Sequence, residues 1–274
     1  MEKHFAVIGH PIAHSLSPVM HRAGYQSIGL NAEYQKFEVR PEDLGDAVKG
    51  LKGLGFSGWN VTVPHKEKIL SFLDELTLEA RRAGAVNTVS VSEGRLVGHN
   101  TDGIGLVRSI QEWIDIEPGK KIVILGAGGA AKGIAMALAP LGVELHVLNR
   151  TAERARDLVE NIRGFGGKAE FEEWGQGDWV SEADCVIQTT TLGLEREEYP
   201  FSLKGISPAT LVVDIIFNPW ETDFLHSAKQ QGCRTINGAG MLLYQGVAAW
   251  EYWLGGQAPV GAMRAALYNT LKYF

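Results

Sequence analysis

Short apolar runs and helical spacings alternate through the first hundred residues, and this pattern predicts strands and helices in turn. Residues 4–8 form an apolar run, while Leu44, Val48 and Leu51 repeat at the period of a helix that opens at Pro41. Because strands that alternate with helices pair in parallel, we expect a mostly parallel sheet. The predicted strands are 4–8, 33–39, 57–63 and a hairpin of 86–91 with 95–98. The first predicted helix is 17–27, with Ser17 as N-cap and Pro18 as N1. Further helices are predicted from Pro41, after Pro64 and from Asp102 through about Trp113.

A second pattern begins after the Pro-Gly pair at 118–119. The apolar strand 121–125 runs directly into a glycine-rich turn and a helix, and strand 144–148 with helix 152–163 repeats this unit. Alternation of this kind is typical of a doubly wound sheet that binds a nucleotide. Further strands of that sheet are predicted at 168–171, 184–188, 210–214 and 234–236.

From Gly240 onward the pattern is helical only. Helices are predicted from Met241 to Leu254 and from Val260 to Tyr273, and they carry many aromatic residues. We expect these helices to return to the first part of the chain, which makes the first domain discontinuous.

Composition narrows the class of protein. The 274 residues carry 26 Lys and Arg against 32 Asp and Glu, so the net charge of −6 argues against a general nucleic-acid binder. Apolar residues make up 45%, which is ordinary for a soluble globular protein. The most apolar segment, 122–143, is interrupted by Lys132, and the first apolar stretch is too short for a signal peptide. We therefore expect no membrane association. Cys185 and Cys233 form no CxxC pair, so we expect buried thiols, which favour a cytoplasmic protein.

The glycine-rich turn is the first candidate site. Gly126-x-Gly128-x-x-Ala131 lies between a predicted strand and a predicted helix, where glycines permit a tight turn and let backbone N–H groups approach a pyrophosphate. The alternative is a glycine-rich turn without a ligand. The predicted dinucleotide contacts in this turn are Gly126, Ala127, Gly128, Gly129, Ala130 and Ala131.

The residues after the second strand of this unit indicate which dinucleotide binds. A site for NAD usually has Asp or Glu there, to hold the ribose 2′-hydroxyl. Here Asn149, Arg150 and Thr151 follow the strand, and Arg154 comes one turn later. Because arginine forms charge-assisted bonds to phosphate, we predict NADP rather than NAD. The alternative is that Asn149 or Thr151 only caps the helix and Arg150 is solvated.

These patterns together predict an α/β protein of two domains. The first is a mostly parallel α/β substrate-binding and catalytic domain formed by 1–103 and 240–274, and the second is a Rossmann-type, doubly wound NADP-binding domain at 104–239.

A dinucleotide domain implies hydride transfer, which needs a proton donor when the acceptor is a carbonyl. His10, His14 and His21 lie near a proline-containing turn, but their spacing fits neither a zinc motif nor one face of a helix. We therefore interpret them as turn or capping residues and expect no metal.

Lys66 and Asp102 are stronger candidates for acid–base chemistry. Lys66 lies in the first turn after a predicted strand, at the edge where parallel α/β sheets bind ligands. A lysine beside a helix N-terminus is disfavoured as a cation, so it gives up its proton more easily. Asp102 begins another helix and is able to bond both the lysine and a substrate hydroxyl. The alternatives are a solvated Lys66 and an Asp102 that is only an N-cap.

Several segments together resemble the shikimate dehydrogenase family. They follow in order along the chain as 9–21 (GHPIAHSLSPVMH), 58–66 (GWNVTVPHK), 84–88 (GAVNT), 100–103 (NTDG), the Gly126 turn, 149–151 (NRT), 214–219 (DIIFNP) and 237–245 (NGAGMLLYQ). The first three are highly specific.

The resemblance implies a substrate and a role for individual residues. Members of the family reversibly reduce 3-dehydroshikimate to shikimate with NADPH, in aromatic amino-acid and chorismate biosynthesis. Lys66 would be the acid and base, paired with Asp102. By the same resemblance, Ser15 and Ser17 would hold the substrate carboxylate, Thr62, Asn87, Asp102 and Gln245 would bind ring hydroxyls with Asn60 close by, Asn149, Arg150, Thr151 and Arg154 would hold the 2′-phosphate, and Ile215, Gly238 and Met241 would lie near the nicotinamide.

Some positions depart from the family's usual residues. Phe217 stands where most members have a tyrosine whose hydroxyl contacts the substrate carboxylate. A hydrogen bond to a charged group is worth roughly 1.5–3 kcal/mol, so its loss predicts weaker substrate binding. Other departures are Arg22 in place of an asparagine, the 188–191 stretch Gln-Thr-Thr-Thr, and Leu194 in place of a common methionine.

Two other functions stay open. Phe217 leaves room for a quinate/shikimate dehydrogenase or a paralogue of relaxed specificity, although the pair Ser15 and Ser17 favours shikimate. A non-catalytic NADP-binding regulatory protein of the same fold is the third possibility, and the presence of both Lys66 and Asp102 argues against it. We expect a small-molecule substrate, no nucleic acid as partner, and a monomer or homodimer.

Overall fold

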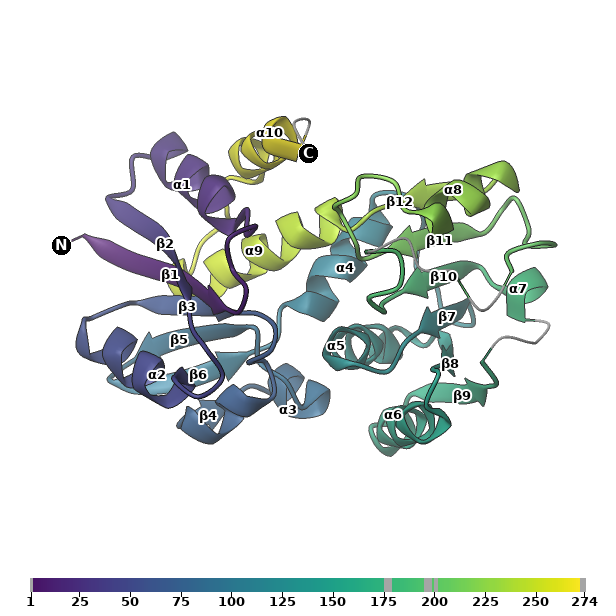
Figure 1. The fold of residues 1–274 in the computed structure, drawn as a ribbon, viewed down its shortest axis with the longest axis horizontal. Helices are drawn as coiled ribbons and strands as arrows, with labels where there is room; N and C mark the ends of the chain where they lie inside the picture. Colours follow the sequence, from purple (N-terminus) through teal and green to yellow (C-terminus); the bar gives the residue numbers. More distant parts are fainter. Residues whose placement is uncertain (1, 175–178, 195–198, 200–201, 272–274) are drawn as a thin grey trace. The chain divides into compact units, whose positions relative to one another are not determined.

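The computed structural model describes residues 2–174, 179–194, 199 and 202–271 (Figure 1). The chain divides into two compact units. Unit 1 contains the chain up to Gly105 together with the segment that begins at Leu242, and unit 2 contains Leu106–Met241. The sequence pattern placed the boundaries at 103 and 240, whereas those of the structure lie two residues further along, inside helices α4 (Asp102–Gln111) and α9 (Ala239–Leu254).

Unit 1 is built on a six-stranded sheet of order β2-β1-β3-β5-β6-β4. Strand β1 pairs in parallel with β2 and β3, while β5 pairs antiparallel with both β3 and β6. The hairpin at Glu93 and Gly94 is present as predicted, and its two strands make this part of the sheet antiparallel. The strands are β1 (Lys3–Gly9), β2 (Ala32–Glu38), β3 (Gly58–Val61), β4 (Glu75–Leu76), β5 (Thr88–Ser92) and β6 (Arg95–His99).

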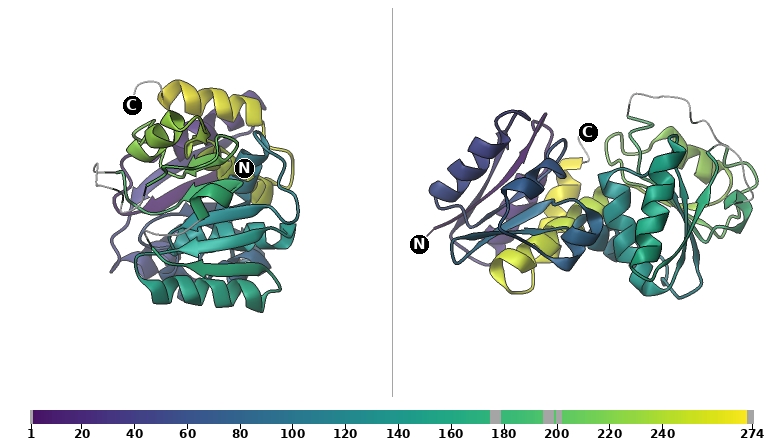
Figure 2. Two further views of the ribbon diagram at one scale, coloured as in Figure 1. Left: turned by 90° about the vertical axis from the view of Figure 1, so that its right-hand side faces the viewer. Right: turned by 90° about the horizontal axis from the view of Figure 1, so that it is seen from below.

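Helices cover both faces of this sheet because alternate residues of β1 point to opposite sides. Ala6 and Ile8 pack in one core cluster with Leu44 of α2 (Leu44–Gly53). Phe5 stacks on Trp253 of α9 with ring centroids 4.8 Å apart. Helix α10 (Val260–Leu271) lies against α1 (Ser17–Ser27), as Figures 1 and 2 show, so the C-terminal helices belong to the first unit as expected.

Three local predictions for unit 1 were wrong. The chain after Pro64 forms a turn and then a 3-10 helix, η1 (Lys68–Phe72), followed by β4 and the short helix α3 (Leu78–Ala83), none of which has a clear periodic signal. Ser17 is the first residue of α1, and Leu16 takes the N-cap position without a side-chain bond. Helix α2 begins at Leu44, because residues 41–43 form a turn.

His21 is also not the turn or capping residue we expected. Its ring is fully buried on α1 and stacks on the Tyr34 ring at 4.4 Å with an interplanar angle of 2°. Burial lowers the pKa of His21 to about 3, so the ring is neutral at physiological pH. Neither ring nitrogen has a hydrogen-bond partner among the described residues. His21 therefore contributes to an aromatic core, together with Tyr25 and Trp250.

Unit 2 contains the doubly wound sheet that the sequence predicts. Its six strands are all parallel, in the order β12-β11-β10-β7-β8-β9. This order reverses direction beside β7, which is the topological switch point where such sheets bind ligands. The strands are β7 (Lys121–Leu125), β8 (Glu144–Leu148), β9 (Lys168–Glu172), β10 (Cys185–Gln188), β11 (Leu211–Asp214) and β12 (Arg234–Ile236).

Two apolar clusters fill the two faces of the unit 2 sheet. Ile122 and Ile124 of β7 pack in one cluster with residues of α5 (Gly129–Leu138) and α6 (Ala152–Gly164). Val123 and Leu125 pack in the other cluster with residues of α8 (Asp223–Gln230). The segment 139–141 after α5 is the 3-10 helix η2, and α7 (Trp179–Glu182) precedes β10. Both cysteines are buried and free, as predicted.

No helix in the described part of the chain is long and apolar enough to cross a membrane.

Gly58 gives a direct test of the packing of α9 on the sheet. A methyl group at Gly58 would lie 2.3 Å from Trp253 Nε1 and 2.7 Å from the Val89 carbonyl oxygen. We expect Gly58→Ala to destabilise the protein by about 1–3 kcal/mol in urea unfolding, because an overpacked core has to shift. Gly50→Ala is the matched control: it has no atom within 4 Å and lies inside α2, so it should stabilise by about 0.5–1 kcal/mol. Equal effects would contradict the packing described.

Candidate active site

Lys66 and Asp102 form a close ion pair in unit 1. Lys66 Nζ donates to Asp102 Oδ2 at 2.5 Å, and the side chains are 20% and 6% exposed. Lys66 lies in the turn that follows β3, as predicted, two residues before η1 begins. Asp102 is the first residue of α4, and its own N–H bonds the side chain of Asn100, so it is not an N-cap.

Asn87 holds the other oxygen of the Asp102 carboxylate. Its Nδ2 donates to Asp102 Oδ1 at 2.8 Å and lies 2.9 Å from Thr101 Oγ1. Its Oδ1 accepts the backbone N–H of Thr101 at 2.8 Å. Asn87 directly precedes β5 and is buried, so a buried carboxylate, an ammonium group and an amide are fixed together.

Asn60 differs from the other predicted substrate-binding residues. It lies on β3, where its Oδ1 accepts from the Tyr34 hydroxyl at 2.6 Å. Its Nδ2 donates to the Asn87 backbone oxygen at 3.1 Å and to Thr88 Oγ1 at 2.9 Å. Both N–H groups of this buried amide are therefore used inside the protein, and Asn60 has no donor left for a substrate.

The remaining predicted substrate residues fall into two groups. Ser15, Ser17, Thr62 and Gln245 belong to unit 1, together with Lys66 and Asp102. The Ser17 backbone N–H contacts Ser15 Oγ at 3.4 Å, and Gln245 on α9 donates to the Leu242 carbonyl at 2.9 Å. Thr62 directly follows β3 and is half-buried. Phe217, half-buried after β11, is the one predicted substrate residue in unit 2.

The glycine-rich turn of unit 2 has the shape that a pyrophosphate needs. Gly126 has φ +118°, and a methyl group on it would lie 2.4 Å from Thr189 Oγ1, so glycine is required there. Gly128 is exposed at the N-cap of α5, and methyl groups built on Gly128 or Gly129 meet no atom within 4 Å. The first N–H groups of a helix lack intrahelical acceptors and attract anions, so the turn is able to hold a phosphate.

The two predicted arginines are available for a further phosphate. Thr151 takes the N-cap position of α6 without a side-chain cap, and Asn149 Nδ2 donates to the Thr151 carbonyl at 2.9 Å. Arg150 and Arg154 are exposed, and neither side chain has a hydrogen bond or ion pair within the part of the chain that the structure describes. Two free guanidinium groups beside the end of β8 fit the 2′-phosphate of NADP.

The residues predicted to lie near the nicotinamide also belong to unit 2. Gly238 packs so closely on Ile215 that a methyl group on Gly238 would lie 1.9 Å from the Ile215 carbonyl oxygen. The Gly238 N–H donates to the Ile216 carbonyl at 3.0 Å, and Met241 is nearly buried near the start of α9. The contact explains why glycine stands at this position.

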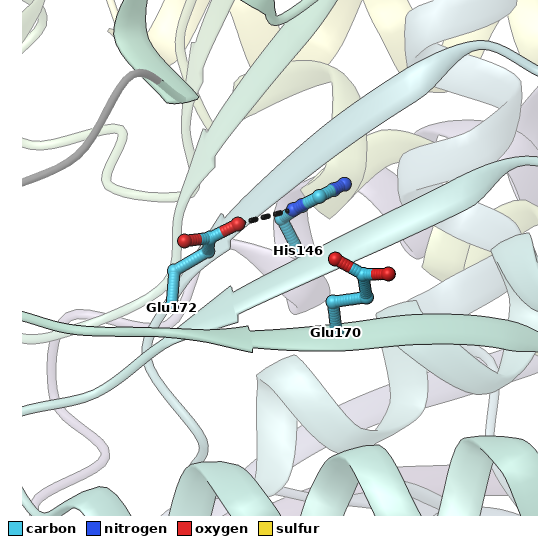
Figure 3. A group of neighbouring side chains, drawn as sticks. All are labelled: His146, Glu170 and Glu172. Atoms are coloured by element: carbon cyan, nitrogen blue, oxygen red, sulfur yellow. Dashed lines mark hydrogen bonds and ion pairs between the residues drawn. The ribbon is translucent and has the colours of Figure 1, made fainter.

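A group of side chains outside these sites was not predicted from sequence. His146 on β8 is the register partner of Glu170 on β9, and Glu172 lies on the same face of the sheet (Figure 3). His146 Nδ1 lies 2.7 Å from Glu172 Oε1, and one ligand atom from each of the three lies within 4.8 Å of the others. Glu170 is exposed, and the His146–Glu172 contact joins two of the three side chains. The absence of a metal from the chemistry stays a prediction.

Comparison with known proteins gives one consistent result. Residues 7–89 match the model of the shikimate dehydrogenase substrate binding domain, 110–216 that of shikimate / quinate 5-dehydrogenase, and 238–268 that of the shikimate 5'-dehydrogenase C-terminal domain. A shikimate dehydrogenase (NADP(+)) of Desulfitobacterium hafniense is 70% identical over 99% of both chains.

Two solved structures are similar to this chain over nearly its whole length. Shikimate 5-dehydrogenase of Thermus thermophilus, in complex with NADP(H) and shikimate, has a TM-score of 0.87 and 36% identity, covering 97% of this chain and 99% of that one. Quinate dehydrogenase of Corynebacterium glutamicum, in complex with NAD, has a TM-score of 0.89 and 30% identity, covering 98% and 99%.

The fold and the site define an NADP-dependent oxidoreductase that acts on a CH–OH group. The family models together match most of the chain. The relative from Desulfitobacterium is 70% identical over nearly the whole length of both chains. The chain belongs to the shikimate dehydrogenase family.

Sequence reasoning missed three residues around Asn87. Tyr34, Thr88 and Thr101 are fully buried and bond the Asn60 and Asn87 amides. Thr88 and Thr101 stand inside the motifs at 84–88 and 100–103, next to residues that were given roles. A polar residue in a predicted buried strand is the one signal that could have identified Thr88, because such a group needs a partner.

Arg150 tests the cofactor preference. We expect Arg150→Ala to raise the KM for NADPH by roughly tenfold or more, because a hydrogen bond to a charged group is lost. The KM for NADH should change less than twofold, since NADH has no 2′-phosphate. Arg156→Ala is the control, because Arg156 is exposed on the same helix but packs over Phe171. Equal effects on both cofactors would rule out the phosphate contact.

Proposed function

We propose that this chain catalyses the NADPH-dependent, reversible reduction of 3-dehydroshikimate to shikimate. The observation that carries the proposal is the Lys66–Asp102 pair. Its Asp102 side chain is buried, and Asn87 holds the carboxylate. A ketone that is reduced needs a proton at its oxygen, and a lysine ammonium bonded to a fixed carboxylate is a proton donor of defined direction. The likeness to NADP-dependent shikimate dehydrogenases supports the choice of substrate.

NADPH, when bound, supplies the hydride that reaches the carbonyl carbon. Lys66 Nζ gives a proton to the carbonyl oxygen in the direction of reduction. In the direction of oxidation the neutral amine of Lys66 takes the proton from the hydroxyl. Asp102 accepts a hydrogen bond from Lys66 in both directions, so Nζ keeps one orientation while its proton count changes. The pair therefore works as one acid–base unit.

Substrate binding in this proposal uses short polar side chains. Ser15 and Ser17 hold the carboxylate, and Thr62, Asn87, Asp102 and Gln245 bind the ring hydroxyls. Groups of this kind suit a small polyhydroxy acid, because each hydroxyl needs a nearby partner that both donates and accepts. Asn60 bonds Asn87 and Thr88 instead of the substrate, since its amide is already used by buried partners.

NADPH would be held in this proposal by unit 2. Its pyrophosphate would lie on Gly126–Ala131 at the start of α5, and its 2′-phosphate on Arg150 and Arg154, with Asn149 and Thr151 beside them. Ile215, Gly238 and Met241 would contact the nicotinamide. The open space above Gly128 and the free guanidinium groups support this placement.

Quinate is the second candidate substrate, because Phe217 lacks the hydroxyl that most members of the family place on the carboxylate and because the chain resembles a quinate dehydrogenase. A purely regulatory NADP-binding protein has no need of a Lys66–Asp102 pair.

We further propose a cytoplasmic protein that acts as a monomer or homodimer.

The function is tested by following NADPH absorbance with NADP⁺ or NAD⁺ against shikimate or quinate. We expect the fastest turnover with shikimate and NADP⁺, and Lys66→Ala to lower kcat by at least about 100-fold while NADPH binding is unchanged, because proton transfer contributes 10²–10⁴-fold. Lys68→Ala is the control, since Lys68 is exposed nearby and bonds only the Pro41 carbonyl. Full turnover by Lys66→Ala would refute the acid–base role, and activity with quinate alone would refute the substrate.

Phe217 tests how the carboxylate is bound. We expect Phe217→Tyr to lower the KM for shikimate about tenfold, because the new hydroxyl adds a hydrogen bond to a charged group. The KM for NADPH should not change. An unchanged KM for shikimate would mean that Ser15 and Ser17 hold the carboxylate without help from this position.

A further inference from the structure

A continuous row of buried hydrogen bonds runs beneath the Lys66–Asp102 pair. From the Tyr34 hydroxyl, which is also hydrogen-bonded to the Ser17 side chain, it passes through two amides and one threonine before it reaches the carboxylate. The bonds are Tyr34 to Asn60 Oδ1 at 2.6 Å, Asn60 Nδ2 to Thr88 Oγ1 at 2.9 Å, Thr88 Oγ1 to Asn87 Oδ1 at 3.1 Å, Asn87 Nδ2 to Asp102 Oδ1 at 2.8 Å, and Lys66 Nζ to Asp102 Oδ2 at 2.5 Å.

Two backbone groups determine which way each amide faces. The Asn87 carbonyl oxygen only accepts, so the edge of Asn60 that meets it at 3.1 Å has to be Nδ2. The Thr101 N–H only donates, so the edge of Asn87 that meets it at 2.8 Å has to be Oδ1. Asn60 therefore presents Oδ1 to Tyr34, and Asn87 presents Nδ2 to Asp102. Neither amide is able to flip without losing a backbone partner.

The direction of the row follows from these two amides. Tyr34 has to donate, and burial raises the pKa of Tyr34 well above its usual value, so its hydroxyl keeps the proton. Thr88 accepts from Asn60 and donates to Asn87 Oδ1 at 3.1 Å, which is the shorter of its two remaining contacts, since Thr101 Oγ1 lies at 3.3 Å. Every donor in the row therefore points toward Asp102. Hydrogen bonds in such a chain polarise one another, so the last N–H toward the carboxylate is strengthened.

Thr88 is the link that joins the two amides. Its side chain is fully buried. Its hydroxyl contacts Asn60 Nδ2, Asn87 Oδ1 and, at 3.3 Å, Thr101 Oγ1. If the hydroxyl were absent, Asn60 would keep a buried N–H without an acceptor and Asn87 would lose one of its donors. Burial leaves no room for solvent to replace the hydroxyl, so the cost falls on the orientation of the amides.

We infer that Thr88 is a positioning residue for the acid–base pair: its hydroxyl orients Asn87, and Asn87 in turn fixes the Asp102 carboxylate that holds Lys66. The inference rests on the proposed function for its effect on turnover, but not for its effect on Lys66. Thr88 does not touch the substrate in this scheme. It acts only through Asn87 and Asp102.

The test compares Thr88→Val with Thr88→Ser. Valine has the shape of threonine without the hydroxyl, and serine keeps the hydroxyl. We expect Thr88→Val to lower kcat for shikimate oxidation about tenfold, which corresponds to one lost hydrogen bond, and Thr88→Ser to restore most of it.

A double-mutant cycle separates positioning from general damage. If Thr88 acts through Asp102, Thr88→Val should cost less than about twofold in kcat once Asp102→Asn is present, because the two effects are not additive. Thr210→Val is the matched control: the buried Thr210 hydroxyl bonds the Ala183 carbonyl at 2.7 Å in unit 2, and its loss should lower stability without changing kcat.

A second readout does not depend on the substrate. The rate at which an amine-reactive reagent labels Lys66, measured by peptide mass spectrometry, reports how tightly Asp102 holds Nζ. We expect labelling several-fold faster in Thr88→Val than in the natural protein, and unchanged in Thr88→Ser and Thr210→Val. If the natural protein did not turn over shikimate, the proposed function would be refuted. The labelling experiment would still test the role of Thr88. Unchanged labelling of Lys66 in folded Thr88→Val, or additive losses in the cycle, would overturn the role of Thr88.

Discussion

The buried carboxylate of Asp102 is the constraint on which the polar cluster of unit 1 depends. A buried charge is costly unless it is paired and hydrogen-bonded. Asp102 meets this requirement with Lys66 on one oxygen, Asn87 on the other, and a place in the first turn of α4, where the helix dipole favours negative charge. Because Asn87 is itself bonded to Asn60 on β3 and to Thr88 on β5, hydrogen bonds connect the sheet of unit 1 to the Lys66–Asp102 pair.

The two units differ in the side chains that they contain. Unit 1 contains the short polar side chains and the Lys66–Asp102 pair, while unit 2 contains the glycine-rich turn and Arg150 and Arg154. The net charge of −6 means that phosphate recognition has to depend on local groups, and the start of α5 with Arg150 and Arg154 is the candidate for them in the function proposed above. A phosphate site built from backbone N–H groups needs glycines at fixed places, which accounts for Gly126 and Gly128.

The parts that could be predicted from sequence are those in which local pattern and chemistry coincide. The β7–turn–α5 unit follows from an apolar run, two glycines and a helical period, and all six strands of the unit 2 sheet were placed within about two residues. The turn after Pro64 and the two-residue β4 escaped prediction because neither is long enough to show a period. His21 was misassigned for a related reason: a histidine in a turn-rich segment gives no local sign that Tyr34 will cover it.

The sequence by itself determined the α/β class, and it predicted NADP as the cofactor and Lys66 with Asp102 as the candidate acid–base pair, because these inferences depend on residue types at given places along the chain. Only the tertiary structure decided that Asn60 faces inward and that Thr88 joins it to Asn87, since Asn60 is 27 positions from Asn87 and 28 from Thr88 along the chain. Orientation of a buried amide is set by the partners on both of its edges, and no single segment contains them. The step from a list of polar residues to a directed row of hydrogen bonds therefore required the fold.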